Sequence, residues 1–194
     1  MRAAPTPLSD RLDAALIYAA GVHRGQRKAG AAPYLAHLLA VAAIVLQYGG
    51  DEDEAIAALL HDAVEDHGGL ARLDDIRARF GEAVAATVLG CTDDLSQPEP
   101  PWRARKEAYL AHLAAAAPST VLVSAADKLD NLRTLARDYR AEGEAIWARR
   151  KTGREARLWY CRALADALRA TGHAPALVAE VGRQVDEIER LVRG

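Results

Sequence analysis

The stretch from Ala57 to His67 constrains this chain more than any other part of its sequence. Four apolar residues, 57–60, lead into five ionisable side chains within seven positions: His61, Asp62, Glu65, Asp66 and His67. Burying that many charges is costly unless they are paired or hold a metal ion. Neither glycine nor proline interrupts the run before Gly68, so the pattern predicts one helix from Asp51 that ends at the glycine pair.

The spacing within this stretch places its polar groups on adjacent helix faces. Residues four apart share a face, so His61 lies above Glu65 and Asp62 above Asp66. His61 and Asp62 are about 100° apart around the helix, and both can therefore reach one ion. Imidazole together with carboxylate suits a first-row divalent metal. The alternative is a solvated helix end with a chance acidic cluster, which the apolar residues before His61 argue against.

Composition favours a helical fold. Hydrophobic residues make up 51% of the 194 positions, Ala and Leu dominate them, and Phe occurs once. Strand-type alternation is hard to find, and both Ala and Leu are strong helix formers. A chain of this length can bury a sizeable core in one domain. We therefore expect an all-α, single-domain helical bundle over residues 1–194.

The expected helices begin and end at local signals. Ser9 can cap the first helix after two prolines, and Pro175 can start the last. Ser119 can cap a long helix that runs through Leu132, and the chain from 142 to 193 has a helical pattern. The other expected helices cover 33–48, 51–67, 73–80, 82–91 and 102–117, with a proline-rich loop over 92–101.

Charge and hydropathy exclude several classes of protein. The formal net charge is −2, which does not suit a bulk nucleic-acid binder. The longest apolar run, 38–46, is too short to span a bilayer, and the first ten residues lack the apolar core of a signal peptide. Cys91 and Cys161 are too isolated for a disulfide framework and are expected to be buried thiols. We expect a cytoplasmic protein, and the sequence leaves a homo-oligomer open.

Two further positions are candidates for polar groups at the edge of the core. His37 lies in an apolar neighbourhood, where a satisfied core histidine and a metal ligand are both plausible. Asp127 follows the apolar run 121–126, so its carboxylate needs a partner. Asn131 is one helical turn further on the same face. The alternative for Asp127 is an ordinary ion pair with Lys128 or an arginine.

Three basic segments could hold anions. Residues 21–30 form a glycine-punctuated loop that contains Arg27 and Lys28, which could bind phosphate or stack on a base, or simply be solvated. The helix expected from Trp102 carries cations in its first turns, where they are unfavourable unless an anion or solvent compensates them: Arg103, Arg105 and Lys106. The segment 147–157 includes Arg154 and is of a kind that is usually a solvated face.

The order of the motifs resembles a known family. HRGQ…PYLAH, ALLHDAVED, FG…GCTDD, PPWRARKEAYLAHL and ADKLDNLR follow one another along the chain. Together they resemble the HD metal-dependent phosphohydrolase superfamily, and within it the hydrolase domain of RelA/SpoT homologues. They look most like the small alarmone hydrolases of the bacterial branch, over residues from about 9 to 170. The resemblance implies an HD-type helical bundle.

The resemblance also implies roles for the acidic and histidine positions. The metal ligands of the family, which usually hold manganese, fall on His37, His61, Asp62 and Asp127. The catalytic acidic pair falls on Glu65 and Asp66, and Asn131 matches the asparagine that contacts the ribose region of the substrate. His67 receives no role.

The substrate contacts are less regular than the metal positions. The family's base-stacking arginine falls on Arg27 or Lys28, because the loop is one residue short. Lysine there would stack more weakly, since an ammonium lacks a planar face. His23 is expected to buttress this loop. Animal-type members have a lysine at the position of Leu95, and the cations that could replace it, or hold phosphate elsewhere, are Arg103, Arg105, Lys106 and Arg154.

The activity that the resemblance implies is hydrolysis of the 3′-pyrophosphate of guanosine tetra- or pentaphosphate (ppGpp or pppGpp). The products are GDP or GTP and pyrophosphate, and the partner is a small-molecule nucleotide. One alternative is a related phosphohydrolase for adenosine alarmones or for the 2′-phosphate of NADPH. Another is a nucleotide-sensing module without turnover, which predicts a damaged ligand or acid set. All six of those positions carry the expected residue types.

Overall fold

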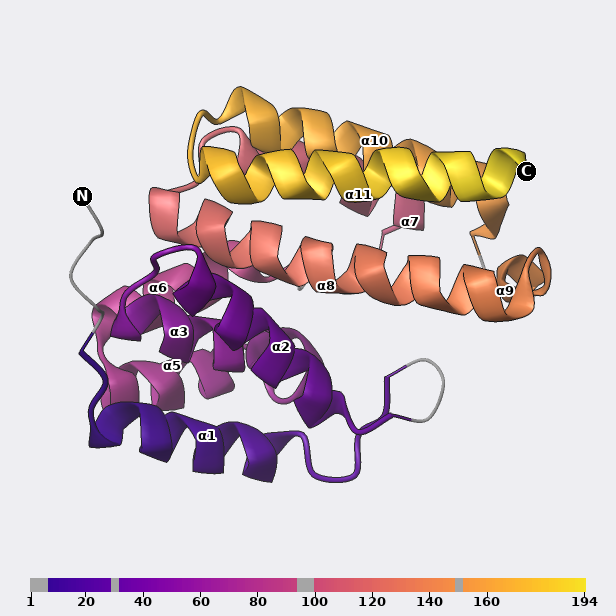
Figure 1. Cartoon of the computed structure of the whole chain (residues 1–194). Helices are drawn as coiled ribbons and strands as arrows, with labels where there is room; N and C mark the ends of the chain where they lie inside the picture. Colours follow the sequence, from indigo (N-terminus) through magenta and orange to yellow (C-terminus); the bar gives the residue numbers. More distant parts are fainter. Residues whose placement is uncertain (1–6, 29–31, 94–99, 149–151) are drawn as a thin grey trace.

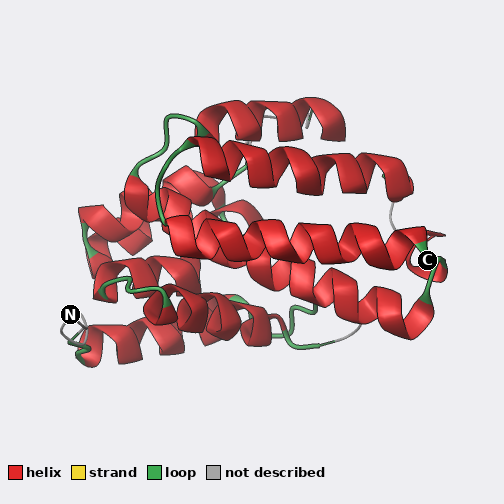
Figure 2. Cartoon of the chain, turned by 45° about the horizontal axis from the view of Figure 1, so that its top comes forward, coloured by secondary structure: helices red, strands yellow, loops and turns green. Residues whose placement is uncertain are grey.

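A computed structural model describes residues 7–28, 32–93, 100–148 and 152–194, and every regular element in these ranges is a helix (Figures 1 and 2). The only extended pairing among them is an isolated antiparallel bridge between Arg27 and Pro33. The helices are α1 (Asp10–Val22), α2 (Tyr34–Gln47), α3 (Glu52–Leu60), α4 (Ala63–Asp66), α5 (Gly69–Phe80), α6 (Glu82–Cys91), α7 (Trp102–Leu113), α8 (Pro118–Glu142), α9 (Ala145–Ala148), α10 (Gly153–Ala170) and α11 (Pro175–Arg193). The all-α prediction is confirmed.

Polar side chains cap the starts of α1 and α3. The Ser9 hydroxyl accepts a hydrogen bond from the Arg11 amide at the start of α1, as the sequence predicts. Asp51 and Glu54 form a reciprocal capping box at the start of α3. Each bond satisfies an amide that has no partner inside the helix.

The prediction of one helix over 51–67 is wrong. Helix α3 ends at Leu60, α4 begins at Ala63, and His61 and Asp62 lie in the turn between them. The imidazole Nδ1 of His61 lies 2.8 Å from the carbonyl oxygen of Ala58, which an unbroken helix would pair with the Asp62 amide. A side chain therefore takes the place of a backbone donor, and no glycine or proline is needed to interrupt the helix.

Other boundaries also differ from expectation. Helix α5 begins at Gly69 rather than at 73, and α7 ends at Leu113 rather than at 117. Helix α8 begins at Pro118, with Ala117 as its cap, so Ser119 lies inside the first turn. Proline is well suited to that first position, because its missing N–H would have no partner there. The last helix starts at Pro175, as predicted.

Helix α8 is the centre of the arrangement. It contacts α2, α3 and α6 on one side and α11 on the other, and Figure 1 shows α10 and α11 above it and α1, α2, α3, α5 and α6 below. Ala125, Ala126 and Leu129 of α8 are fully buried in one continuous apolar cluster with α2 and α3. These contacts bring three segments that carry candidate ligands together: α2, the turn after α3, and α8.

Two smaller observations concern the cysteines and the length of the apolar helices. Neither cysteine, both being among the described residues, is in a disulfide. Cys161 is buried, as expected, whereas Cys91 is only half-buried. Within the described ranges, no helix combines the length and the apolar character needed to cross a membrane.

Candidate active site

Three buried side chains converge where α2, the turn after α3, and α8 meet. Nε2 of His37 lies 3.1 Å from Oδ1 of Asp127, and Nε2 of His61 lies 3.7 Å from the same oxygen. One donor atom from each residue lies within 4.8 Å of the other two, and all three residues are buried. Two imidazoles and a carboxylate in this arrangement can hold a divalent metal.

Asp62 completes a set of four donors. Its Oδ2 lies 3.0 Å from Nε2 of His61 and 3.8 Å from Nε2 of His37. The same oxygen accepts a hydrogen bond from the Tyr34 hydroxyl. The structure therefore brings together the four residues on which the family resemblance places the metal ligands.

The two histidines are oriented so that Nε2 points into the cluster. Nδ1 of His37 lies 2.6 Å from Oδ2 of Asp130, and Nδ1 of His61 lies 2.8 Å from the Ala58 carbonyl. Each acceptor fixes the proton on Nδ1 and leaves a lone pair on Nε2. Both Nε2 atoms are buried and have no hydrogen-bond partner among the described residues. Orphaned buried nitrogens beside two carboxylates fit a bound cation.

The pKa shifts of the cluster residues are also consistent with a bound cation. Burial lowers the pKa of the His61 imidazole, but the negative charges of Asp62 and Asp127 outweigh it and hold this pKa well above its ordinary value. Burial raises the pKa of the Asp127 carboxyl, yet Lys128 and the two histidines hold it well below its usual range. The two acids thus favour positive charge between them, which a divalent ion would supply.

A polar cavity opens beside the cluster. It is lined by Lys28, Tyr34, Asp62, Glu65, Cys91, Asp93, Lys106, Tyr109, Asp127, Lys128, Asn131 and Tyr160. A more apolar pocket shares five of these residues and adds Leu132, Thr134, Leu135, Arg157, Cys161 and Leu164. The adjoining pair can take a ligand with an anionic end near the cluster and a less polar end beside α10.

The two predicted catalytic acids face different ways. Glu65 lines the polar cavity, and its carboxylate accepts a hydrogen bond from the Asp93 amide at 3.2 Å. Loss of solvent in the cavity raises the pKa of the Glu65 carboxyl above its ordinary value. Asp66 is not among the residues that line the described cavities, and its Oδ2 accepts a hydrogen bond from the Gln26 carboxamide at 2.7 Å.

The loop between α1 and α2 separates its two adjacent cations. Lys28 lines the cavity, with Nζ 5.3 Å from the ring centroid of Tyr34, and its burial lowers the pKa of its ammonium. Arg27 is exposed, and its guanidinium donates to the Gln26 carbonyl. The bridge to Pro33 involves Arg27 and extends the backbone there, so consecutive side chains point to opposite sides. Of these two candidates for a substrate contact, Lys28 lines the cavity and Arg27 does not.

Among three other cations predicted to contact substrate, one lines the cavity and two lie outside it. Lys106 lines the cavity, with Nζ 2.5 Å from Oδ2 of Asp93. Arg103 lies outside it, with its guanidinium carbon 3.1 Å from the ring centroid of Trp159. Arg154 is also outside and pairs with Glu144 and the Val192 carbonyl. The structure thus does not bring Arg103 or Arg154 to the site.

Several residues at the site were missed or understated by sequence reasoning. Asp130, behind His37, gave no signal beyond being an acid near Asp127. Lys128, considered only as an ordinary ion-pair partner, is 2.5 Å from Oδ2 of Asp127 and lines both pockets. Arg157 and Tyr160 line the apolar pocket. Position 95 and the basic residues 149–151 lie outside the described residues.

The fold and the site define a class: an all-α protein whose buried His–Asp cluster, suited to a divalent metal, opens onto a cavity rich in lysine. Comparison with known proteins agrees. Residues 15–154 match the family model described as the HD domain. The chain is 40% identical, over 134 residues that cover 64% of it and 72% of the relative, to guanosine-3′,5′-bis(diphosphate) 3′-pyrophosphohydrolase MESH1 of Xenopus tropicalis.

Two further matches cover almost the whole chain. MESH1 of Drosophila melanogaster is 32% identical over 179 residues, which are 90% of each protein. A solved structure described as a metazoan ortholog of SpoT that hydrolyzes ppGpp superposes with a TM-score of 0.73 at 31% identity, covering 92% of this chain and 97% of that one. The chain belongs to the HD-domain family and, within it, to the group of guanosine-3′,5′-bis(diphosphate) 3′-pyrophosphohydrolases.

Proposed function

We propose that this protein hydrolyses the 3′-pyrophosphate of ppGpp and pppGpp to give GDP or GTP and pyrophosphate. The observation that carries the proposal is the cluster of two buried imidazoles, the buried Asp127 carboxylate and the partly buried Asp62 carboxylate, beside a cavity lined by Lys28, Lys106 and Lys128. Such a site suits a polyanionic substrate and a metal-assisted displacement at phosphorus. The names of the relatives, which share 32–40% of their aligned residues with this chain, point to the same reaction.

The resident metal is proposed to be manganese, held by His37, His61, Asp62 and Asp127. The nitrogen and oxygen donors suit several divalent ions, and the resemblance to the alarmone hydrolases selects manganese among them. When bound, such an ion makes a coordinated water acidic enough to act as a nucleophile near neutral pH.

The chain's own residues then handle protons and charge. Glu65 is beside the cluster in the cavity and takes a proton from the attacking water. The water oxygen bonds to the phosphorus attached to the ribose 3′ oxygen, and that ester bond breaks. The 3′ oxygen leaves as a hydroxyl after gaining a proton. We assign to Asp66 the transfer to this oxygen of the proton that Glu65 removed from the water. Lys28, Lys106 and Lys128 offset the negative charge on the phosphoryl oxygens.

The adjoining apolar pocket suits the nucleoside. Leu132, Leu135 and Leu164 line it, and the Asn131 side chain lies at the border that it shares with the polar cavity. A ribose near Asn131 would place its 3′ substituent toward the metal and its base toward the leucines. The flexible ammonium of Lys28 provides no planar surface for the base.

The lack of a planar surface on Lys28 supports a second candidate class of substrate. Because the described part of the loop places a lysine, Lys28, at the cavity rather than an arginine, the same site could accept adenosine alarmones, or NADPH through its 2′-phosphate. Purified protein should be incubated with Mn²⁺ and, in parallel, with ppGpp, pppGpp, ppApp and NADPH, and the products separated by ion-exchange chromatography. We expect the guanosine substrates to be hydrolysed fastest, with pyrophosphate as the released group.

An Asp127→Asn variant is the control for contaminating phosphatases, because it removes a metal-binding carboxylate with little change in shape. Faster release of orthophosphate from NADPH would assign the chain to the alternative class. Binding of ppGpp without any product would mark a nucleotide-sensing module.

A further inference from the structure

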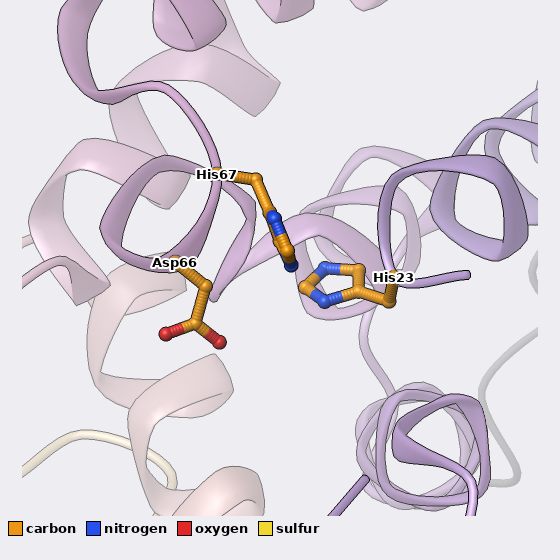
Figure 3. Close-up of side chains that lie close together, drawn as sticks. All are labelled: His23, Asp66 and His67. Carbon is orange, nitrogen blue, oxygen red and sulfur yellow. The ribbon is translucent and has the colours of Figure 1, made fainter. Parts of the chain in front are cut away.

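The carboxamide of Gln26 joins three side chains that lie outside the metal cluster. Its Oε1 lies 2.7 Å from Nδ1 of His23 and 2.6 Å from Nε2 of His67, and its Nε2 donates to Oδ2 of Asp66 at 2.7 Å. Figure 3 shows the rings of His23 and His67 close together and the Asp66 carboxylate beside them. The loop between α1 and α2 is thereby tied to the end of α4.

The chemistry of the bonds fixes the orientation of the amide. The Asp66 carboxylate only accepts hydrogen bonds, so the amide nitrogen must face it. The amide oxygen then faces both histidines, and each of them must donate a proton to it. Every polar atom of the Gln26 side chain is used, with both acceptor sites of its oxygen filled. A hydrogen-bonded network this complete holds its members in one arrangement.

The backbone of Gln26 is held as well. Its amide donates to the His23 carbonyl at 3.0 Å, and its carbonyl accepts from the Tyr34 amide at 3.0 Å. The His23 ring is 3% exposed and stacks on the Tyr34 ring, with centroids 5.2 Å apart and planes inclined by 14°. Tyr34 in turn donates to the proposed metal ligand Asp62. Gln26 therefore has little freedom to move.

His23, Asp66 and His67 also satisfy the donor-distance criterion for a cation site, within 4.8 Å of one another. Gln26 argues against that use, because its carboxamide already bonds to all three side chains. A metal would have to displace the amide and break three hydrogen bonds. The observations favour the network over the cation.

We propose that Gln26 is a positioning residue for Asp66, and that His23 and His67 orient its carboxamide for this purpose. The inference rests on the proposed function, in which Asp66 supplies the proton to the leaving oxygen. The Gln26 bond occupies Oδ2 of Asp66 and leaves Oδ1 for the reaction. His67, which receives no role from the family resemblance, thus supports the site through Gln26.

A kinetic comparison tests the proposal. Gln26→Glu keeps an oxygen acceptor for both histidines but replaces the donor to Asp66 with a second carboxylate, which repels it. We expect kcat for ppGpp to fall roughly 10-fold or more, with KM changed less than about 2-fold and bound Mn²⁺ unchanged. Gln47→Glu is the matched control, because Gln47 is exposed at the end of α2, and it should behave as wild type.

Side-chain amide NMR tests the contact without relying on turnover. The Gln26 NH₂ signals can be assigned by their loss in Gln26→Glu, and the Gln47 signals by their loss in Gln47→Glu. Asp66→Ala removes the acceptor, so we expect the Gln26 signals to shift and the Gln47 signals to stay. If the wild type hydrolyses none of the nucleotides, the proposed function fails, and this comparison still decides whether Gln26 holds Asp66.

Three results would overturn the inference. The first is a wild-type kcat in Gln26→Glu, and the second is a loss of Mn²⁺ or a rise in KM that accounts for the whole loss of activity. The third is a second equivalent of Mn²⁺ or Zn²⁺ that binds to the wild type and is lost in both His23→Ala and His67→Ala. That third outcome would identify the cluster as a cation site.

Discussion

Nδ1 of His37, a member of the metal cluster, lies 2.6 Å from Oδ2 of Asp130, which lies behind this histidine. Asp130 comes from α8, the helix that also carries the proposed ligand Asp127. One helix thus supplies a ligand and the group that orients another ligand from α2. A carboxylate behind a histidine ligand fixes its tautomer and makes its free nitrogen a stronger donor.

Removing that carboxylate should weaken the metal site without removing a ligand. For Asp130→Ala we expect Mn²⁺ affinity to fall roughly 10- to 100-fold, the usual effect of losing such a partner. Metal titration with calorimetry measures it, and Asp138→Ala, further along α8, is the control. An unchanged dissociation constant for Asp130→Ala would show that the hydrogen bond does not support His37.

Glu65 and the ligands should be separable by experiment. His61→Ala should lose metal and activity together, because it removes a donor of the buried cluster. Glu65→Gln should keep the metal but lower kcat by about 10²- to 10⁴-fold, the range for loss of a general base. Mass spectrometry measures the bound metal, and steady-state kinetics with ppGpp measure kcat. Full activity of Glu65→Gln would remove it from the mechanism.

The neighbours Arg27 and Lys28 offer a matched pair of cations. Lys28 lines the cavity and Arg27 is exposed outside it. Lys28→Met should raise KM for ppGpp about 10-fold, equivalent to ~1.4 kcal/mol, because it removes a positive charge next to the phosphates. Arg27→Met should change KM by less than about 2-fold. Equal effects, or the reverse order, would contradict the placement of the loop.

Cys91 should react slowly with alkylating reagents despite lining the cavity. Its burial raises the pKa of the thiol to about 11. The thiolate is the form that reacts, and at pH 8 only about 0.1% of the Cys91 side chains are thiolate. The labelling rate should therefore rise about 10-fold per pH unit toward pH 11. Peptide mass spectrometry after iodoacetamide treatment over pH 7–9 measures this rise. Rapid labelling of native protein at pH 7 would contradict it.

Two helical glycines should respond oppositely to the same substitution. A Cβ at Gly90 would lie 2.5 Å from Oγ1 of Thr120, across the contact between α6 and α8. Gly90→Ala should therefore destabilise the fold by about 1–3 kcal/mol. Gly21, in α1, has open space around a Cβ, and Gly21→Ala should add roughly 0.5 kcal/mol. Urea unfolding gives both values, and a stable Gly90→Ala would show that the two helices can separate at no cost.

Much of the fold follows from local patterns in the sequence. The helical composition, the Ser9 cap and the start of the last helix at Pro175 each depend on nearby residues, and all agree with the structure. The break at His61 does not follow from such signals, because it depends on an imidazole that bonds to the Ala58 carbonyl. A side-chain competitor of this kind has no signature in hydrophobic periodicity.

Some features of the candidate site also follow from the sequence, and others depend on the folded structure. The residue types and order of the motifs were enough to select His37, His61, Asp62 and Asp127 by resemblance, and the structure brings their donor atoms together. Whether Arg27 or Lys28 reaches the cavity depends on the backbone bridge to Pro33. The Asp130 contact joins residues 93 positions apart. Three-dimensional packing alone determines such pairs.

We propose above that this protein removes pyrophosphate from ppGpp with the aid of a metal in the His–Asp cluster. The most direct measurement is product analysis of ppGpp incubated with purified, Mn²⁺-loaded protein, with GDP and pyrophosphate quantified together. We expect GDP and pyrophosphate in equal amounts from the wild type, and neither product from the Asp127→Asn variant. Release of orthophosphate instead of pyrophosphate, or intact ppGpp after incubation with protein that has bound its metal, would contradict it.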